Sequence, residues 1–442
     1  MARSHCTQWP ASHSGVGVPA MRSRRLHTSP ARMQQHGFSL VELMVAITIG
    51  LFLLAGAVTM FTTNRRVYED QQDLAELQQS ARFAVETLAY DLRMAGYIGC
   101  AHDPARLVSL LAGAVQNGGA AGGLFDFSLP VEGLEAGNNW LPTGNGIDFV
   151  VVNRGAPAVL LDDPAGPAVD AASDAITLRS IGGPRADITA PANGAAGGVV
   201  TIDNTLLRIA PGDVVAISDC AGTELFQNTA PTDPLNPIAT LGHAEGGLGI
   251  ETTNVRATLS RNYTNDLTSP ASVSRVTAVR YFIGSFVPDG PAGVQEPSRR
   301  GLFRRYWDPV AAGGGLMRNE LLVDGVDRME ITYGVDGTGD GLPDVYVPAN
   351  DAALGAQPRN WANVTAVRVG LLLRSLRPQA GESDRPPPVA DPICADQREV
   401  NGVCLPYGSQ PAAAALGLID GVRRRVVNTT VFLRNDLPVP NP

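Results

Sequence analysis

The stretch Gly37-Phe38-Ser39-Leu40-Val41-Glu42-Leu43 opens an apolar run that continues to Phe61 and decides the organisation of the chain. The nineteen residues from Leu43 to Phe61 carry no charge. At about 1.5 Å per residue they would span roughly 28 Å as a helix, close to the thickness of the hydrocarbon core of a bilayer. The segment can therefore cross a membrane. Glu42 stands at its edge, and an ionised carboxylate there is costly unless a cation pairs with it.

The residues from Gly37 to Glu42 resemble the prepilin processing site of type IV pilins and type II secretion pseudopilins. The resemblance implies that a prepilin peptidase cleaves between Gly37 and Phe38 and methylates the new amino terminus of Phe38. Glu42 then becomes the fifth residue of the mature chain. The resemblance also implies that the Glu42 carboxylate pairs with the Phe38 ammonium group of a neighbouring subunit inside an apolar filament core.

Two other interpretations of the apolar run are open. An ordinary secretory signal peptide also has a basic leader and an apolar core, and Ala55-Gly56-Ala57 offers a small-residue cleavage site. That interpretation leaves Glu42 without a role. The run can also be a plain single-pass anchor that never assembles. We favour the pilin-like interpretation.

The segment before the processing site, residues 1–37, is predicted to be a leader peptide that is removed. It contains five arginines and no acidic residue, so the positive-inside rule predicts that it stays in the cytoplasm. Arg65 and Arg66, just beyond the span, oppose this bias. Pilin leaders are usually short, so Met21 or Met33 is an alternative start.

The helix is predicted to continue beyond the membrane-spanning run. Charged residues such as Asp73 lie largely on other faces, and Gly96 supplies a carboxyl-terminal stop signal. A helix over residues 38–95 would be roughly 87 Å long, with 38–61 as its transmembrane or filament-core half and 62–95 as an amphipathic half. Residues 96–442 would form a periplasmic, β-rich head. The apolar stripe at steps of three and four residues is Leu74, Leu77, Ala81, Val85, Leu88, Leu92 and Ala95.

Further segments narrow the resemblance to the PilW-type minor pilins of type IV pilus assembly. The segment from Asp91 to Cys100 carries it together with the processing site, and weaker similarities follow at residues 212–220, 364–375 and 426–435. The resemblance implies an inner-membrane, single-pass protein with a periplasmic head that later enters the extracellular pilus. The implied partners are other minor pilins, the major pilin, a pilus tip adhesin, the prepilin peptidase and the inner-membrane assembly platform.

Short β-prone runs separated by Gly, Pro, Asn and Asp follow Cys100 and predict an antiparallel sheet packed on the helix. The predicted fold class is therefore α+β and pilin-like, with long loops in the head. The β-prone runs are 147–152, 175–179, 199–202, 214–217, 276–283 and 364–373, with a last strand near 426–435.

Composition and motifs argue against two classes of function. The formal net charge of the chain is −9, and removal of the basic leader would make the mature protein more acidic, which argues against nucleic-acid binding. We find no motif of a nucleophilic or metal-dependent enzyme, and the carboxylates are scattered, so no catalytic residue is predicted. The chain is predicted to be a structural protein and not an enzyme.

Four cysteines remain after the leader: Cys100, Cys220, Cys394 and Cys404. An oxidising periplasm permits two disulfides, and four cysteines allow three full pairings. Closure of the short polar loop between Cys394 and Cys404 is the simplest pairing, and it leaves Cys100 with Cys220.

One loop suggests a cation site. Asp336, Asp340 and Asp344 lie at spacings that resemble those of an EF-hand loop, but Val347 stands where the bidentate glutamate belongs. A Gly/Asp-rich hairpin turn explains the same residues. Weak Ca²⁺ binding is a hypothesis, and no other cofactor is predicted.

The resemblance to the PilW-type proteins implies the function of a minor pilin that helps to initiate type IV pilus assembly, supports twitching motility and cell adhesion, and lies at or near the pilus tip. One alternative is a minor pseudopilin of a type II secretion system, which shares the processing site and the helix. A second alternative is a membrane-tethered, Ca²⁺-dependent binding module that never polymerises.

Overall fold

A computed structural model describes fourteen parts of the chain, and these fall into two units, Met1–Arg66 and Val67–Pro442. The leader, including Gly37 and Phe38, lies outside the described residues. The described residues are 39–100, 106–111, 124–127, 129–135, 151–152, 159–160, 168–170, 173–247, 253–266, 270–287, 299–308, 316–354, 361–376 and 422–435.

The predicted long helix is α1, which runs from Leu40 to Met94. Its end is set by Gly96, whose φ of 78° places the backbone in the left-handed region that favours glycine. The Gly96 N–H donates to the carbonyl oxygen of Arg179 at 3.0 Å, so the chain leaves the helix directly onto a strand. The helix that the sequence predicts over residues 38–95 is therefore confirmed, except that Ser39 is not helical and the carboxyl-terminal boundary lies one residue earlier.

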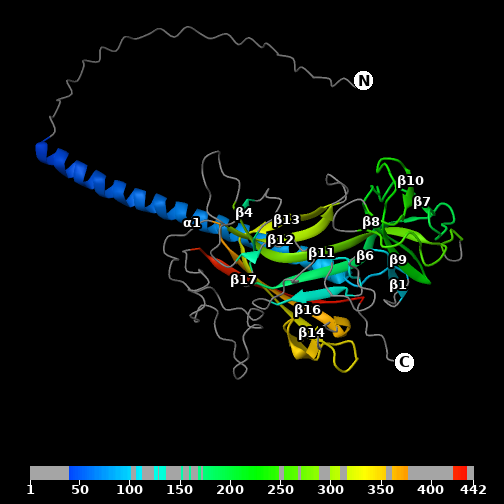
Figure 1. The fold of residues 1–442 in the computed structure, drawn as a ribbon. Helices are drawn as coiled ribbons and strands as arrows, with labels where there is room; N and C mark the ends of the chain where they lie inside the picture. Colours follow the sequence, from blue (N-terminus) through cyan, green and yellow to red (C-terminus); the bar gives the residue numbers. More distant parts are fainter. Residues whose placement is uncertain are drawn as a thin grey trace, which may run out of the picture. The chain divides into compact units, whose positions relative to one another are not determined.

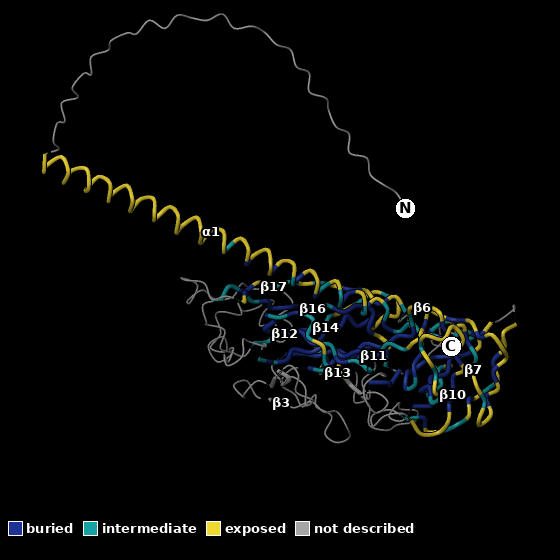
Figure 2. The backbone as a smooth tube through the Cα atoms, turned by 90° about the horizontal axis from the view of Figure 1, so that it is seen from above, coloured by how far each residue is buried: buried dark blue, intermediate teal, exposed yellow. Residues whose placement is uncertain are grey.

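The part of α1 in the second unit buries one face against the head (Figure 2). Buried positions recur every three or four residues through Leu77, Ala81, Leu88 and Leu92, as the apolar stripe predicts. The start of the stripe is wrong by one position: Leu74 is 38% exposed, whereas Asp73 is buried. Asp73 lies one helical turn before Leu77 on the buried face, so helical geometry places the aspartate there.

The described residues of the head form three β-sheets where the sequence predicts one (Figure 1). Among the described residues, the largest sheet has 11 strands, and its main path is β1-β9-β8-β11-β12-β13. Strands β4, β5 and β6 also pair with β11, β2 pairs with β6, and β3 pairs with β5. A four-stranded sheet has the order β15-β14-β16-β17, and β7 pairs with β10 in a sheet of two strands. Most pairings are antiparallel, as predicted, but β1 with β9, β3 with β5 and β4 with β11 are parallel.

The strands that the structure describes have the following bounds. In the large sheet they are β1 Leu107–Ser109, β2 Val131–Leu134, β3 Val151–Val152, β4 Val159–Leu160, β5 Ala168–Asp170, β6 Ala175–Asp187, β8 Val214–Asp219, β9 Gly222–Gln227, β11 Ser272–Val287, β12 Arg299–Asp308 and β13 Leu316–Asp324. The two smaller sheets contain β7 Val199–Asp203, β10 Ile238–Gly242, β14 Val326–Val335, β15 Val345–Val347, β16 Val364–Arg374 and β17 Arg424–Phe432, and two short 3₁₀ turns are η2 Ala352–Leu354 and η3 Trp361–Asn363.

One hydrophobic core joins α1, the large sheet and the four-stranded sheet. It brings Leu88 and Leu92 of the helix together with Tyr281 of β11, Ile331 of β14 and Val369 of β16. A second core, formed by residues between 186 and 273 together with Leu110, joins β7 and β10 to β8 and β9 through Val200, Ile217, Phe226 and Leu241. We call residues 186–273 the β7–β10 lobe. Burial of these apolar side chains is the main source of stability in both places.

A close approach at Gly133 of β2 gives a stability prediction. A Cβ atom at this position would overlap the phenol ring of Tyr333, which is buried on β14. Gly133→Ala is therefore expected to destabilise the head by about 1–3 kcal/mol through overpacking, measured by urea unfolding of the solubilised chain.

The matched control uses the partner of the overlap. The Tyr333 hydroxyl is buried and finds no hydrogen-bond partner among the residues that the structure describes. Removing the hydroxyl in Tyr333→Phe therefore should not lower stability, and the double variant Gly133→Ala/Tyr333→Phe should recover part of the loss. A double variant as unstable as the single Gly133 variant would contradict the proposed overlap.

Candidate functional site

The first half of α1 carries the apolar surface that the sequence singles out. The helix is long and apolar enough to cross a membrane, and its residues from Leu40 to Phe61 are exposed within their unit (Figure 2). The threonine hydroxyls of this segment donate to backbone carbonyls one turn back, as Thr59 does to Ala55 at 2.7 Å and Thr48 to Val45 at 2.9 Å. Because these hydroxyls are satisfied within the helix, they do not oppose an apolar environment.

Glu42 sits in the first turn of α1 and caps it. The backbone N–H of Ser39 donates to Glu42 Oε2 at 3.2 Å, and the Leu43 N–H donates to the Ser39 carbonyl oxygen at 3.1 Å. Ser39-Leu40-Val41-Glu42 has the spacing of a capping box, in which a glutamate three residues into the helix satisfies the N–H of the capping residue. The positive end of the helix dipole also favours a carboxylate here.

The geometry brings Glu42 back to Ser39, the second residue after the predicted cleavage site. Ser39 is directly next to Phe38, and Gly37 and Phe38 lie outside the described residues. Cleavage between Gly37 and Phe38, methylation of Phe38 and pairing of its amino group with Glu42 therefore stay predictions. What the structure adds is that one carboxylate oxygen of Glu42 is directed toward the start of the helix.

The far end of α1 is fastened to the head by polar contacts that sequence reasoning missed. The Tyr281 hydroxyl of β11 donates to Asp91 Oδ2, and the Asn435 amide donates to the Arg93 and Ala95 carbonyl oxygens at 3.3 and 3.2 Å. Burial raises the pKa of Asp91, and burial together with the adjacent carboxylate raises the pKa of Tyr281, so the tyrosine remains a donor. These contacts fasten the last turns of α1 to the head.

A disulfide joins Cys100 to Cys220, as the simplest pairing predicts. Cys100 follows the end of α1, and Cys220 lies in the turn between β8 and β9, 120 residues further along the chain. The bond thus ties the end of the helix to the β7–β10 lobe. Cys394 and Cys404 lie outside the described residues, and their disulfide stays a prediction.

A buried ion pair joins β2 and β6, two neighbouring strands of the large sheet. Arg179 of β6 is buried and donates to Glu132 of β2 at 2.7 Å and to the Leu124 carbonyl oxygen at 2.8 Å. Burial opposes ionisation of Glu132, but the positive charges of Arg179 and Arg280 outweigh burial and hold the pKa of Glu132 below its usual value. No sequence pattern indicated this pair, because Arg179 lies in a run of strand residues and Glu132 is 47 positions away.

The proposed cation loop is organised by its own backbone. Asp336 Oδ1 accepts from the Gly339 N–H at 2.6 Å, and its Oδ2 accepts from the Gly341 N–H at 2.6 Å. Asp344 Oδ2 accepts from Gly337 and Thr338. Within the described ranges, no three His, Cys, Asp or Glu side chains are grouped so that they could hold a metal ion. Ca²⁺ binding would compete with these bonds, and it stays a prediction for calorimetry with Asp340→Ala as the comparison.

The same loop gives a prediction about local order. Burial alone would raise the pKa of Asp336, but hydrogen bonds from the Gly341, Gly339 and Thr338 N–H groups lower it. Asp336→Ala should increase amide exchange in residues 337–341 by about tenfold, because it removes a group that orders the turn. The matched control Asp340→Ala removes one bond, to Leu342 N–H at 2.9 Å, and should leave these amides protected.

Lowering the pH tests the same contact in the unsubstituted chain. Since the folded-state pKa of Asp336 is depressed, its contribution to the turn is present above the ordinary aspartate pKa of about 4 and is lost as the pH falls through the lower folded-state value. Equal exchange in both variants at neutral pH would contradict the role given to Asp336.

Two protein-family models match the chain. The model of the type IV pilus-assembly protein W matches residues 286–435, and the model of the prokaryotic N-terminal methylation motif matches residues 32–58. A solved structure of a type IV-like pilin from Thermus thermophilus is similar with 17% sequence identity and a TM-score of 0.16, and the match covers 36% of this chain and 80% of that chain. A comparison with curated proteins finds no match.

The N-terminal methylation motif, the apolar helix and the β-rich head on which the second half of the helix packs define an α+β, pilin-like protein. Within this class, the match to the pilus-assembly protein W confirms the resemblance to the PilW-type prepilin-like proteins that the sequence indicates. Proteins of this kind are generally structural components. The motif and the single apolar helix are consistent with a pilin anchored in the inner membrane.

Proposed function

We propose that the chain is a minor pilin that takes part in initiating type IV pilus assembly and lies at or near the pilus tip. The observation that carries this proposal is Glu42, the only charged side chain from Leu40 to Phe61, held in the first turn of α1 within the methylation motif. A lone carboxylate in an apolar helix is costly unless it is paired. A filament of such helices supplies the partner, because each subunit brings one amino terminus and one Glu42.

In this proposal a prepilin peptidase removes residues 1–37 and methylates Phe38. The capping geometry prepares the next step: the Ser39 N–H already occupies one oxygen of Glu42, and the other oxygen is left for the ammonium group of a neighbouring subunit. Before assembly the apolar half of α1 lies in the inner membrane with a periplasmic head. After assembly the same half lies among the helices of other minor pilins and the major pilin.

The size of the head supports a place at the tip. Residues 67–442 form a unit with three sheets and a separate core in the β7–β10 lobe. A domain of this size on every subunit would crowd a helical shaft, whereas a tip position leaves it room. A tip position also lets the head contact a larger adhesin, and the match to a pilus-assembly family supports a pilus over a secretion pseudopilus.

The proposal is tested by deletion of the gene in its own cell. Deletion is expected to abolish surface pili and twitching, and expression of the full chain should restore both. Unaffected piliation would contradict the proposal. Loss of exoprotein secretion with normal pili would identify a secretion pseudopilin instead.

A further inference from the structure

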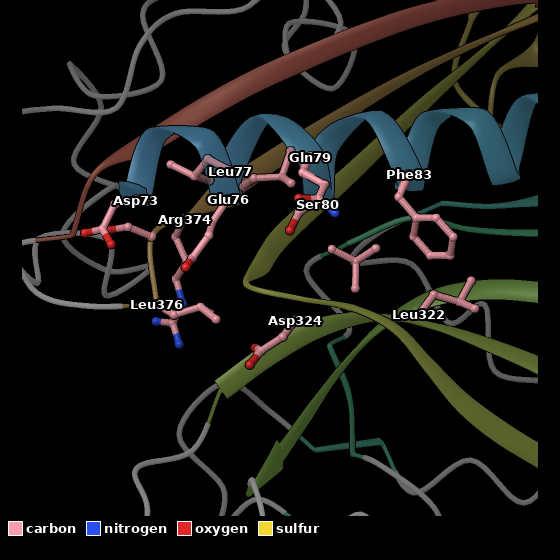
Figure 3. Close-up of a pocket in the computed structure, with 13 residues that line it drawn as sticks. Asp73, Glu76, Leu77, Gln79, Ser80, Phe83, Leu322, Asp324, Arg374 and Leu376 are labelled. Atoms are coloured by element: carbon pink, nitrogen blue, oxygen red, sulfur yellow. The ribbon is translucent and has the colours of Figure 1, made fainter. Parts of the chain in front are cut away.

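A groove of about 310 Å³ lies along α1, between the helix and the ends of β13 and β16 (Figure 3). Charged side chains of its lining are matched within the chain. Asp324 Oδ2 accepts from Arg299 Nη1 at 3.1 Å, and Arg374 Nε lies 3.7 Å from Asp327 Oδ1. Because neighbouring side chains balance these charges, the groove does not select a charged partner.

The outer edge of β10 is a different kind of surface. Among the described residues, β10 pairs only with β7, in the sheet of two strands (Figure 1). Proteins protect exposed edge strands with charged residues, proline or bulges. Ile238–Gly242 contains neither a charged residue nor a proline, and its pairing with β7 has no irregularity. The edge is therefore a template on which another strand can pair.

The direction of the backbone groups of β10 follows from the hydrogen bonds at its last residue. The Gly242 N–H donates to Asn228 Oδ1 at 3.1 Å, and the Gly242 carbonyl oxygen accepts from the Thr229 N–H at 2.9 Å, so both groups point away from β7. Alternate residues of a strand direct their backbone groups to the same edge, so those of Thr240 also point away from β7. Thr201, opposite Thr240 on β7, agrees, because its carbonyl oxygen accepts a hydrogen bond from outside the β7–β10 pair.

The outward groups of Thr240 are free to pair. Its N–H and carbonyl oxygen have no hydrogen-bond partner among the residues that the structure describes, and the same holds for the carbonyl oxygen of Ile238. The Ile238 N–H is occupied by Asn236 Oδ1 at 3.1 Å. Thr240 and Ile238 are exposed, whereas Ala239 and Leu241 are buried. The edge thus offers one donor and two acceptors in positions that solvent reaches.

Exposed apolar side chains lie next to this edge. The turn after β7 contacts the segment before β10, because the Asn204 N–H donates to the Pro237 carbonyl oxygen at 2.7 Å. Leu206 in this turn is 73% exposed, Leu235 is 78% exposed and Ile238 is 59% exposed. Grouped exposed apolar residues mark contact surfaces, so an added strand would find apolar contacts as well as backbone partners.

The backbone geometry separates two possible occupants of the edge. In an antiparallel pair of two copies centred on Thr240, Ile238 of one copy would lie opposite Gly242 of the other. Since the backbone groups of Gly242 are already bonded to Asn228 and Thr229, such a dimer would leave the Ile238 carbonyl oxygen unused. A strand of another protein, with its own backbone groups free, can pair with all three groups of the edge.

We infer that the outer edge of β10 binds an extended segment of another extracellular protein by β-strand addition. The segment would be uncharged where it faces Ile238–Leu241 and would place an apolar side chain beside Ile238, so that backbone bonds give affinity and side chains give specificity. The Cys100–Cys220 disulfide attaches the lobe to the end of α1 away from its apolar half. The inference rests on the proposed function, which leaves this end of the chain open to extracellular proteins.

Site-specific photocrosslinking in the pilus-bearing cell tests the inference. The full chain carries p-benzoylphenylalanine in place of Ile238 or, as a control, in place of Leu342, which is 61% exposed and lies outside the lobe. We expect position 238 to give an adduct to one uncharged, β-prone peptide of another protein, identified by mass spectrometry, and position 342 not to label that peptide. Thr240→Pro should lower the yield of the adduct by about tenfold, because proline removes the free N–H. The matched control Thr240→Ala keeps both backbone groups and should retain the adduct.

A synthetic peptide with the sequence of the adduct gives a second measurement, which does not depend on the folding of a variant. It should bind the purified full chain in fluorescence anisotropy, and methylation of its backbone nitrogens on alternate residues should weaken binding by about tenfold with the side chains unchanged.

Several outcomes would overturn the inference while filaments that contain the chain leave the proposed function standing. They are no adduct, an adduct to a second copy of this chain or only to its own residues, a yield unaffected by Thr240→Pro, and equal binding of the methylated peptide. Absence of the unsubstituted chain from filaments would overturn both.

Discussion

Glu42→Ala is expected to leave prepilin cleavage intact and to lower incorporation of the chain into filaments by roughly 100-fold or more. In the proposed function, cleavage between Gly37 and Phe38 precedes the pairing of subunits, so it would not need the Glu42 charge. In the filament, loss of Glu42 leaves the Phe38 ammonium group unpaired in an apolar core, and breaking a buried ion pair typically costs about 3–5 kcal/mol. Amino-terminal sequencing of the membrane fraction and immunoblots of sheared filaments measure the two steps separately.

Two further variants separate the charge of Glu42 from its role as a helix cap. Glu42→Gln keeps a side-chain acceptor for the Ser39 N–H and removes the charge, so it should behave like the alanine variant if ion pairing decides assembly. Thr48→Ala, on the same helix, removes a hydroxyl that is satisfied internally and should be incorporated normally. Normal incorporation of Glu42→Gln would sink the ion-pair argument.

Removal of the Cys100–Cys220 disulfide is expected to lower the stability of the head by about 2–5 kcal/mol. The bond closes a loop of 120 residues, for which chain entropy alone gives about 5 kcal/mol in the denatured state. The double variant Cys100→Ser/Cys220→Ser avoids a free thiol. Urea unfolding of the detergent-solubilised full chain should show a lower midpoint with little change in slope.

Reduction provides the control for this prediction. Dithiothreitol should destabilise the unsubstituted chain at least as much as the double substitution does. Any further effect of dithiothreitol on the double variant reports on Cys394 and Cys404. An unchanged urea midpoint in the double variant would mean that the disulfide does not stabilise the fold.

The sequence predicts the features that depend on local pattern. The apolar run, the three- and four-residue steps after it and Gly96 are enough to predict α1, and Val364–Arg374 is recognisable as a strand because nearly all of its residues are apolar or β-branched. Glu42 stands out for the same reason, as one charge beside an uncharged run.

Features that depend on contacts between distant segments could not be predicted. The arginines of β12 make it look polar in sequence, although Arg305 is buried in the structure. Glu224 does the same for β9, because the sequence does not reveal that its carboxylate accepts hydrogen bonds from Ser260 and Tyr263. The groove beside α1 needs the ends of β13 and β16, which are more than 200 residues from the helix in the chain. The burial of Leu74 was mispredicted because hydropathy alone assigns the apolar residue to the buried face, whereas in the structure this face contains Asp73 and leaves Leu74 exposed.

The β7–β10 lobe begins and ends at neighbouring points of the large sheet. Asp187, the last residue of β6, is paired with Ser272, the first residue of β11, so the segment between these two strands starts and ends at one residue pair. Within the lobe, β8 pairs with Ser272–Arg275 of β11 and β9 pairs with β1, so these two strands belong to the large sheet. A foreign epitope that leaves the large sheet in register therefore belongs in β7, β10 and the turns next to them, because these two strands pair with each other in a separate sheet.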